Sequence, residues 1–150
     1  MDKYILHKII PDQHLSIGRY FGSITINEIV QLTKNIFSDK DFDPEYDVLL
    51  DFRNCSGIAF KLDILDYIEF FRKSHKLEKK VRVGILYSSI NQEFLIKVYK
   101  GFGAILKLDI ENFKRIEDYF LWMNFSQQQQ DLIIELMQSL RPDSNEIGSF

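Results

Sequence analysis

The sequence has little of several features that mark particular classes of protein. It has one cysteine, Cys55, so no disulfide can form within the chain, and a reducing compartment fits best. No apolar run approaches the roughly 20 residues of a transmembrane helix. The first residues, Met1 to Tyr4, lack the apolar core of a signal peptide. We therefore expect a cytoplasmic protein without a membrane span.

Positive charge is also scarce. The chain has 19 Lys and Arg against 22 Asp and Glu, a net charge of -3, whereas nucleic-acid binding needs a clustered basic face. The three histidines, His7, His14 and His75, share no metal-ligand spacing, and there is no Cys-x-x-Cys or His-x-x-x-His motif. We predict that the protein binds neither nucleic acid nor a metal, and the sequence indicates no cofactor.

Apolar residues, in contrast, are plentiful. Of the 150 residues 45% are hydrophobic and 13 are Phe, which is enough for one domain to bury a core without disulfide or metal. There is no linker, repeat or change of composition along the chain. We expect a single domain over residues 1–142 and a loose C-terminal tail over residues 143–150, after Pro142.

The first part of the chain reads as two strands, a helix and a third strand. Residues 4–10 and 14–21 have strand patterns separated by Pro11-Asp12-Gln13, which predicts an antiparallel hairpin ended by Gly22-Ser23. Thr25 and Glu28 have the spacing of a capping box at the start of a helix. A buried strand is expected over residues 46–51.

Strands and helices then alternate. The expected elements are a helix over residues 61–75, a strand over 81–87, a helix over 89–102, a strand over 105–108 ended by Asp109, a helix over 112–123 and a last helix over 126–140. This order predicts an α/β fold with a mixed, largely parallel five-stranded sheet that begins with a β-hairpin and is flanked by helices.

The third strand stops abruptly at an acid, Asp51, and a small polar segment follows. In open α/β sheets, binding sites lie at such carboxyl ends of strands. The next parallel strand ends in the same way, at Tyr87 and Ser88. The sequence therefore predicts a binding rim, whose candidate residues are Asp51, Arg53, Asn54, Cys55, Ser56, Tyr87 and Ser88.

Four segments in this order resemble the STAS-like family, the sulphate-transporter and anti-sigma-factor-antagonist domains, and in particular its stand-alone bacterial branch. They are Phe21–Thr25 (FGSIT), Val48–Arg53 (VLLDFR), Arg82–Leu86 (RVGIL) and Ile116–Met123 (IEDYFLWM). The resemblance covers about residues 4–123. It implies a STAS-like fold and a non-enzymatic regulatory or protein-interaction domain, with a protein partner.

The resemblance also implies a phosphoacceptor. In the family's best-known members a serine after the third strand is phosphorylated by a partner kinase, and Ser56, followed by Gly57, stands at that place. Asn54 and Cys55 occupy positions where the family has an acid. From the residues alone, Asn54–Gly57 also fits a simple turn, since it is rich in turn-forming residues.

Two enzymatic alternatives are weaker. Cys55 could be a reactive thiol whose pKa Arg53 lowers, or simply a small buried side chain. The acids Asp51, Asp109 and Glu111 follow predicted strands and could meet at one rim, or serve as helix caps. Because no nucleophile, base and orienting residue can be assembled, we predict no catalytic residues.

The number of aromatic residues leaves a further alternative. The residues of runs such as Phe70-Phe71 and Phe120-Leu121-Trp122 cannot all face one direction. The surplus could line a cavity for a small apolar ligand, which would make the protein a carrier or sensor, or form the contact of a homodimer. Packing within the core is the simplest interpretation.

Overall fold

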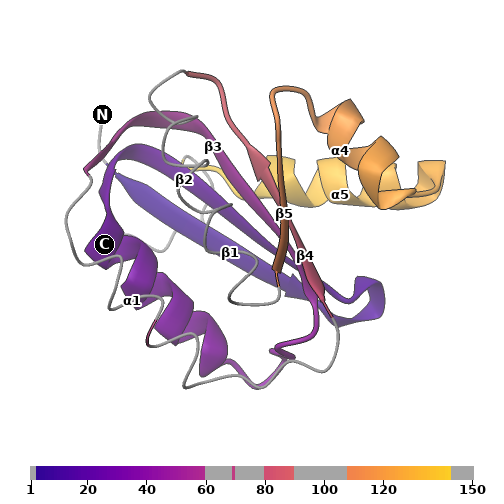
Figure 1. The fold of residues 1–150 in the computed structure, drawn as a ribbon, viewed down its shortest axis with the longest axis horizontal. Coiled ribbons are helices and arrows are strands. Elements are labelled where there is room, and N and C mark those ends of the chain that lie inside the picture. Colours follow the sequence, from indigo (N-terminus) through magenta and orange to yellow (C-terminus); the bar gives the residue numbers. More distant parts are fainter. Residues whose placement is uncertain (1–2, 60–68, 70–79, 90–107, 143–150) are drawn as a thin grey trace.

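The computed structural model describes residues 3–59, 69, 80–89 and 108–142. Its elements are β1 (Tyr4–Ile10), η1 (Pro11–Gln13), β2 (Leu15–Thr25), α1 (Ile26–Phe37), β3 (Asp47–Ala59), β4 (Val81–Leu86), β5 (Leu108–Phe113), α4 (Ile116–Met123) and α5 (Gln127–Ser139). The strands form one sheet in the order β1-β2-β3-β4-β5 (Figure 1). β1 is antiparallel to β2, and the other pairs are parallel, which confirms the predicted α/β fold. The helices expected over residues 61–75 and 89–102 lie outside the described residues.

The predicted hairpin is present. Its register places Tyr4 opposite Phe21 and Ile10 opposite Leu15. Pro11 begins the short η1 helix because its fixed φ suits a first helical position. His14 ends η1 in the left-handed region, at φ 49°, and its N–H donates to the Pro11 carbonyl at 3.0 Å.

Two helices begin where the sequence predicts. The Thr25 hydroxyl accepts the Glu28 N–H at 3.2 Å, which satisfies one of the free donors of the first turn of α1. At α5, Ser126 and Gln129 form a complete capping box: the Gln129 N–H donates to the Ser126 hydroxyl at 3.2 Å, and the Ser126 N–H donates to the Gln129 side chain at 2.9 Å. α5 ends at Ser139, before Pro142.

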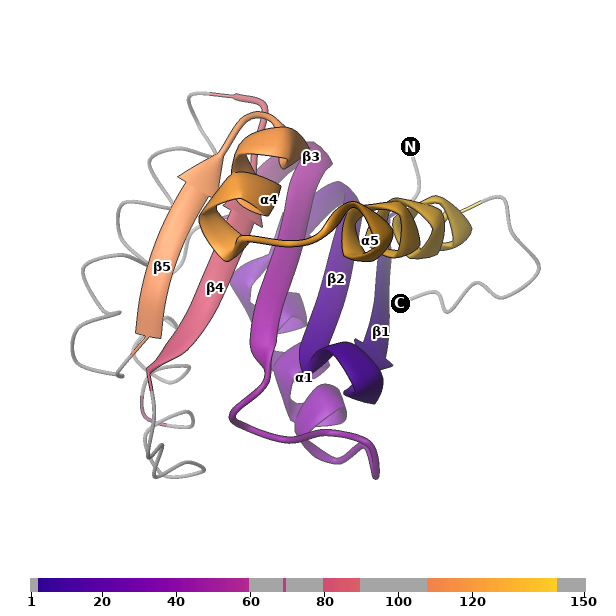
Figure 2. The same ribbon diagram turned by 90° about the vertical axis from the view of Figure 1, so that its right-hand side faces the viewer.

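Helices cover both faces of the sheet. Figure 2 shows α4 and α5 in front of the strands and α1 behind them. Alternate residues of a strand point to opposite faces, so Leu49 joins the core with Tyr119 of α4 and Ile133 of α5, whereas Phe52 joins the core with Leu32 of α1. Among the described helices, none is long and apolar enough to cross a membrane.

Four predicted element boundaries are wrong. β2 does not end at Gly22 but continues to Thr25, and β3 does not end at Asp51 but continues through the predicted turn to Ala59. β5 does not end at Asp109 but runs from Leu108 to Phe113, so α4 begins at Ile116 rather than 112.

β-Bulges explain the long β2–β3 pair. Arg19 and Phe21 lie opposite Asp51 and Asn54, so β3 has one extra residue there. A second irregularity follows at Gly22, whose φ of 85° is accessible to glycine at little cost. Because bulges absorb residues that do not fit the ladder, a turn-like composition is compatible with a continuous strand here.

Candidate functional site

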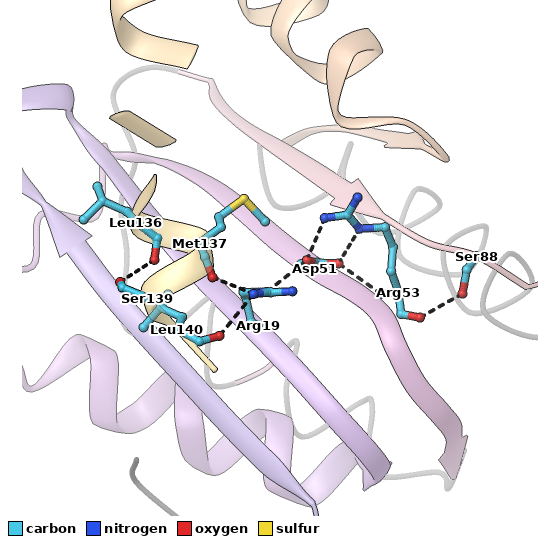
Figure 3. A network of polar contacts seen from close by, with 8 residues as sticks. All are labelled: Arg19, Asp51, Arg53, Ser88, Leu136, Met137, Ser139 and Leu140. Atoms are coloured by element: carbon cyan, nitrogen blue, oxygen red, sulfur yellow. Dashed lines mark hydrogen bonds and ion pairs between the residues drawn. The ribbon is translucent and has the colours of Figure 1, made fainter. Parts of the chain in front are cut away.

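The predicted rim lies where β4 ends and β3 continues. Asp51 is opposite Leu86, the last residue of β4, so Asp51 is in the middle of β3 but level with the end of its neighbour. The pairing of β3 with β4 ends at this point. Beyond it, the Ser88 hydroxyl donates a hydrogen bond to the Arg53 carbonyl of β3 at 3.0 Å. The predicted site therefore lies along a strand edge rather than in a loop (Figure 3).

Ser56 is the extra residue of the second bulge. Gly22 lies opposite Cys55 and Ser23 lies opposite Gly57, which leaves Ser56 without a partner residue in β2. Its side chain is exposed, as is that of Asn54. Bulges are common beside functional sites because they redirect side chains in this way.

Asp51 precedes these residues on β3 and is 1% exposed. Oδ1 accepts the Arg53 backbone N–H at 3.1 Å and Arg53 Nε at 3.0 Å. Oδ2 accepts Arg53 Nη2 at 3.1 Å and Arg19 Nε at 3.2 Å. A buried carboxylate needs such partners, because an unpaired charge out of water is very unfavourable.

Arg19 links this network to α5. Its Nη1 donates to the carbonyls of Met137 at 2.5 Å and Leu140 at 3.1 Å, at the C-terminal end of the helix (Figure 3). A cation is favourable there because the last carbonyls have no partner within the helix. Burial lowers the pKa of Arg19; Asp51 opposes this shift, and Arg53 and Arg141 add to it.

The sequence contained a signal for Arg19 that the rim prediction did not use. Leu15, Ile17 and Arg19 alternate along one face of β2, and Leu15 and Ile17 are both fully buried. A charged residue at the next inward position of such a strand requires a buried partner of opposite charge. The register supplies that partner by placing Arg19 opposite Asp51.

Of the two interpretations of Cys55, a reactive thiol or a small buried side chain, the structure supports the second. Cys55 belongs to the core on the α1 face. Burial, and to a smaller extent the charge of Asp51, raises the pKa of its thiol to about 12. The structure thus gives no support to the hypothesis that Arg53 activates this cysteine, because a thiol with a raised pKa is a poor nucleophile at neutral pH.

The other predicted acids lie at different levels of the sheet. Asp109 and Glu111 are within β5, opposite Arg82 and Gly84, whereas Asp51 is level with the last residue of β4. The alternative in which these acids meet at one rim is therefore not supported, and Asp109 and Glu111, which lie within β5, do not serve as the helix caps that the sequence favoured. Among the described residues, no group of three or more His, Cys, Asp or Glu could hold a metal ion.

The predicted rim residues divide by exposure. Asp51, Cys55 and Tyr87 are buried, while Asn54, Ser56 and Ser88 are exposed and the Arg53 side chain is 32% exposed. We refer to Arg53, Asn54, Ser56 and Ser88 as the polar rim. The buried residues hold this rim in place, and the exposed residues are the ones a partner can reach.

Several aromatic residues pack on one another under α4. Tyr119 contacts Phe113, Phe120, Trp122 and Phe125, with ring centroids between 5.9 and 6.4 Å apart. These rings pack in and against the core between α4 and the sheet. Other aromatic residues that motivated the carrier alternative, including Phe70 and Phe71, lie outside the described residues.

Comparison with known proteins gives the fold. No protein-family model matches the chain, and no curated protein matches it. Among solved structures, it is similar to an uncharacterized protein of the DUF3478 family with a SpoIIAA-like fold from Shewanella loihica PV-4. The TM-score is 0.52 and the identity 21%, over 81% of this chain and 93% of that one. The chain thus has a SpoIIAA-like fold, which confirms the predicted STAS-like architecture.

Proposed function

We propose that the protein is a non-enzymatic regulatory domain of the cytoplasm that binds a partner protein through the polar rim. The observation that carries this proposal is the bulged segment of β3, where exposed Asn54 and Ser56 stand beside a buried ion-pair network. A site on a rigid strand presents its polar groups in a fixed arrangement, which reduces the entropy lost on binding.

The fold supports the same proposal. STAS-like domains, which the sequence resembles, act by binding other proteins, and Ser56 of the rim stands in the sequence where that family has its regulatory serine. Ser56 remains our proposed phosphoacceptor, because its exposed hydroxyl on an unpaired bulge is open to a kinase. It lies in a strand rather than at a helix N-terminus, so a phosphate there would act through added charge and bulk.

Site-specific photo-crosslinking tests the proposal. A benzophenone amino acid is placed at Asn54 or Ser56 in the full-length protein in its native cell. Matched controls carry it at Gln31 on α1 or Glu135 on α5, which are also exposed. We expect one protein to be captured at the rim positions and not at the controls. Equal capture at all four positions, or none at the rim, would contradict a rim interface.

A further inference from the structure

We propose that Arg53 receives a carboxylate of the partner, so that the partner presents an acidic segment to the polar rim. This inference rests on the proposed function and adds the chemistry of the partner. It is carried by an imbalance of charge and by hydrogen-bond donors that the network leaves unused.

The network contains more positive than negative charge. Arg19 and Arg53 share one carboxylate, that of Asp51, so the three groups carry one net positive charge at the rim. Although the whole chain has a net charge of -3, the described residues of this region are locally basic.

Arg53 still has donors to offer. A guanidinium has five N–H donors, and the bonds of Arg53 to Asp51 come from Nε and Nη2. Its Nη1 has no hydrogen-bond partner within the described part of the chain. The Arg53 side chain is 32% exposed, so solvent reaches part of it, and a second carboxylate could bind Nη1.

The neighbouring residues suit an acidic ligand. Asn54 and Ser56 are exposed, neutral and able to donate hydrogen bonds. The one carboxylate among the predicted rim residues, Asp51, is buried and saturated by arginine, so it does not repel an incoming anion at the surface. A carboxylate with one negative charge would also match the single excess charge of the network, which a phosphate would exceed.

A defined acidic probe tests the inference. The full-length protein is titrated with hexaglutamate at low ionic strength, and the Nε–H signal of Arg53 is followed by NMR. We expect a saturable shift of this signal and of the Ser88 amide, abolished by salt because the contact is electrostatic. Hexalysine should cause no such shift. Absence of the Arg53 shift with hexaglutamate would overturn the inference without involving any variant.

Two variants sharpen the test. R53Q should weaken hexaglutamate binding about tenfold or more, the effect of losing one charge-assisted contact. R115Q removes an arginine that is 71% exposed and paired with Glu117, and should leave binding within about twofold. Equal weakening by both variants would indicate general charge attraction and overturn the site.

The outcomes separate this inference from the proposed function. Crosslinking at Asn54 and Ser56 without an Arg53 response to hexaglutamate would overturn the acidic partner alone, whereas loss of specific crosslinking would overturn the interface itself. Inorganic phosphate is titrated in parallel. Saturation by phosphate at lower concentration than by hexaglutamate would identify a site for free oxyanions and overturn the acidic segment.

Discussion

At the scale of single residues, Asp51 determines the shape of the candidate site. Within the described part of the chain, its four hydrogen bonds come from Arg19 and Arg53, so it fixes the positions of both guanidinium groups. A partner cannot reach it, since it is 1% exposed. Its role is to orient Arg53, the residue that we propose meets a partner at the surface.

Replacing Asp51 should therefore be costly. D51N leaves two arginines partly buried without their anion, and breaking such a pair reduces the free energy of unfolding by about 3–5 kcal/mol. Urea denaturation measures this change. The matched control is E117Q, which removes an exposed carboxylate 3.6 Å from Arg115 and should change stability by less than about 1 kcal/mol. A D51N protein as stable as E117Q would show that Asp51 does not hold the network.

Gly84 allows Tyr119 to lie against the sheet. A Cβ atom at Gly84 would be 2.4 Å from two atoms of the Tyr119 ring, whereas at Gly18 its nearest contact would be an ordinary 3.4 Å. G84A should reduce the free energy of unfolding by about 1–3 kcal/mol through overpacking, and G18A should be nearly neutral. Thermal or urea unfolding of both variants checks the difference. Tolerance of G84A would mean that α4 moves away from the sheet easily.

Cys55 should be unreactive in the native protein. With a pKa raised to about 12, about one thiol in ten thousand is ionised at pH 8, against roughly a quarter of unperturbed thiols. Labelling by a disulfide reagent should be slow in buffer and fast in denaturant. The raised pKa also predicts how the free energy of unfolding depends on pH. The contribution of Cys55 is fully present below the usual thiol pKa, and it is lost as the pH rises toward 12 because the thiol of the unfolded chain deprotonates first. Rapid native labelling would contradict the burial of this side chain.

At the scale of secondary structure, α5 is held at both ends. The capping box fixes its first turn, and Arg19 binds the carbonyls of its last turn. The first contact is local in sequence, but the second joins residues more than a hundred positions apart. Arg19 therefore couples the end of α5 to Asp51 and, through Arg53, to the polar rim.

R19K tests this coupling. The planar guanidinium of Arg19 binds Asp51 and two helix carbonyls at once. Lysine keeps the positive charge, but its compact ammonium group cannot make all three contacts. We expect faster amide hydrogen exchange in the last turn of α5, with exchange in the first turn unchanged. R82K is the control, since Arg82 forms a 2.9 Å ion pair with Asp47 on another part of the same face. Unaltered exchange at Leu140 in R19K would show that α5 docks without Arg19.

The sequence predicted elements whose signals are local and missed those set by pairing. Thr25, Ser126 and Pro11 determine chain ends and turns through their own hydrogen bonds or ring geometry, so the hairpin, α1 and α5 could be placed. The segment Asn54–Gly57 has the composition of a turn, but pairing with β2 holds it in a strand by means of bulges. The buried partner of Arg19 depended on sheet register, which composition does not determine.

At the scale of the whole molecule, the sheet is shared by two cores. Leu49 and Leu86 face α4 and α5, while Phe52 and Ile85 face α1. The same strands carry the side chains of both cores. If the sheet came apart, both cores would therefore be exposed to solvent together. This arrangement supports our prediction that residues 1–142 form one folding unit.

Equilibrium unfolding tests that unit. Trp122, the only tryptophan, lies in the α4 core and reports the front layer by fluorescence. Circular dichroism reports helices and strands from both faces. We expect both signals to change in one cooperative urea transition with the same midpoint, as in other small domains. Distinct midpoints would mean that α4 and α5 separate from the sheet before the rest of the protein unfolds. The polar rim, which Arg19 and Asp51 link to α5, would then lose its arrangement before global unfolding.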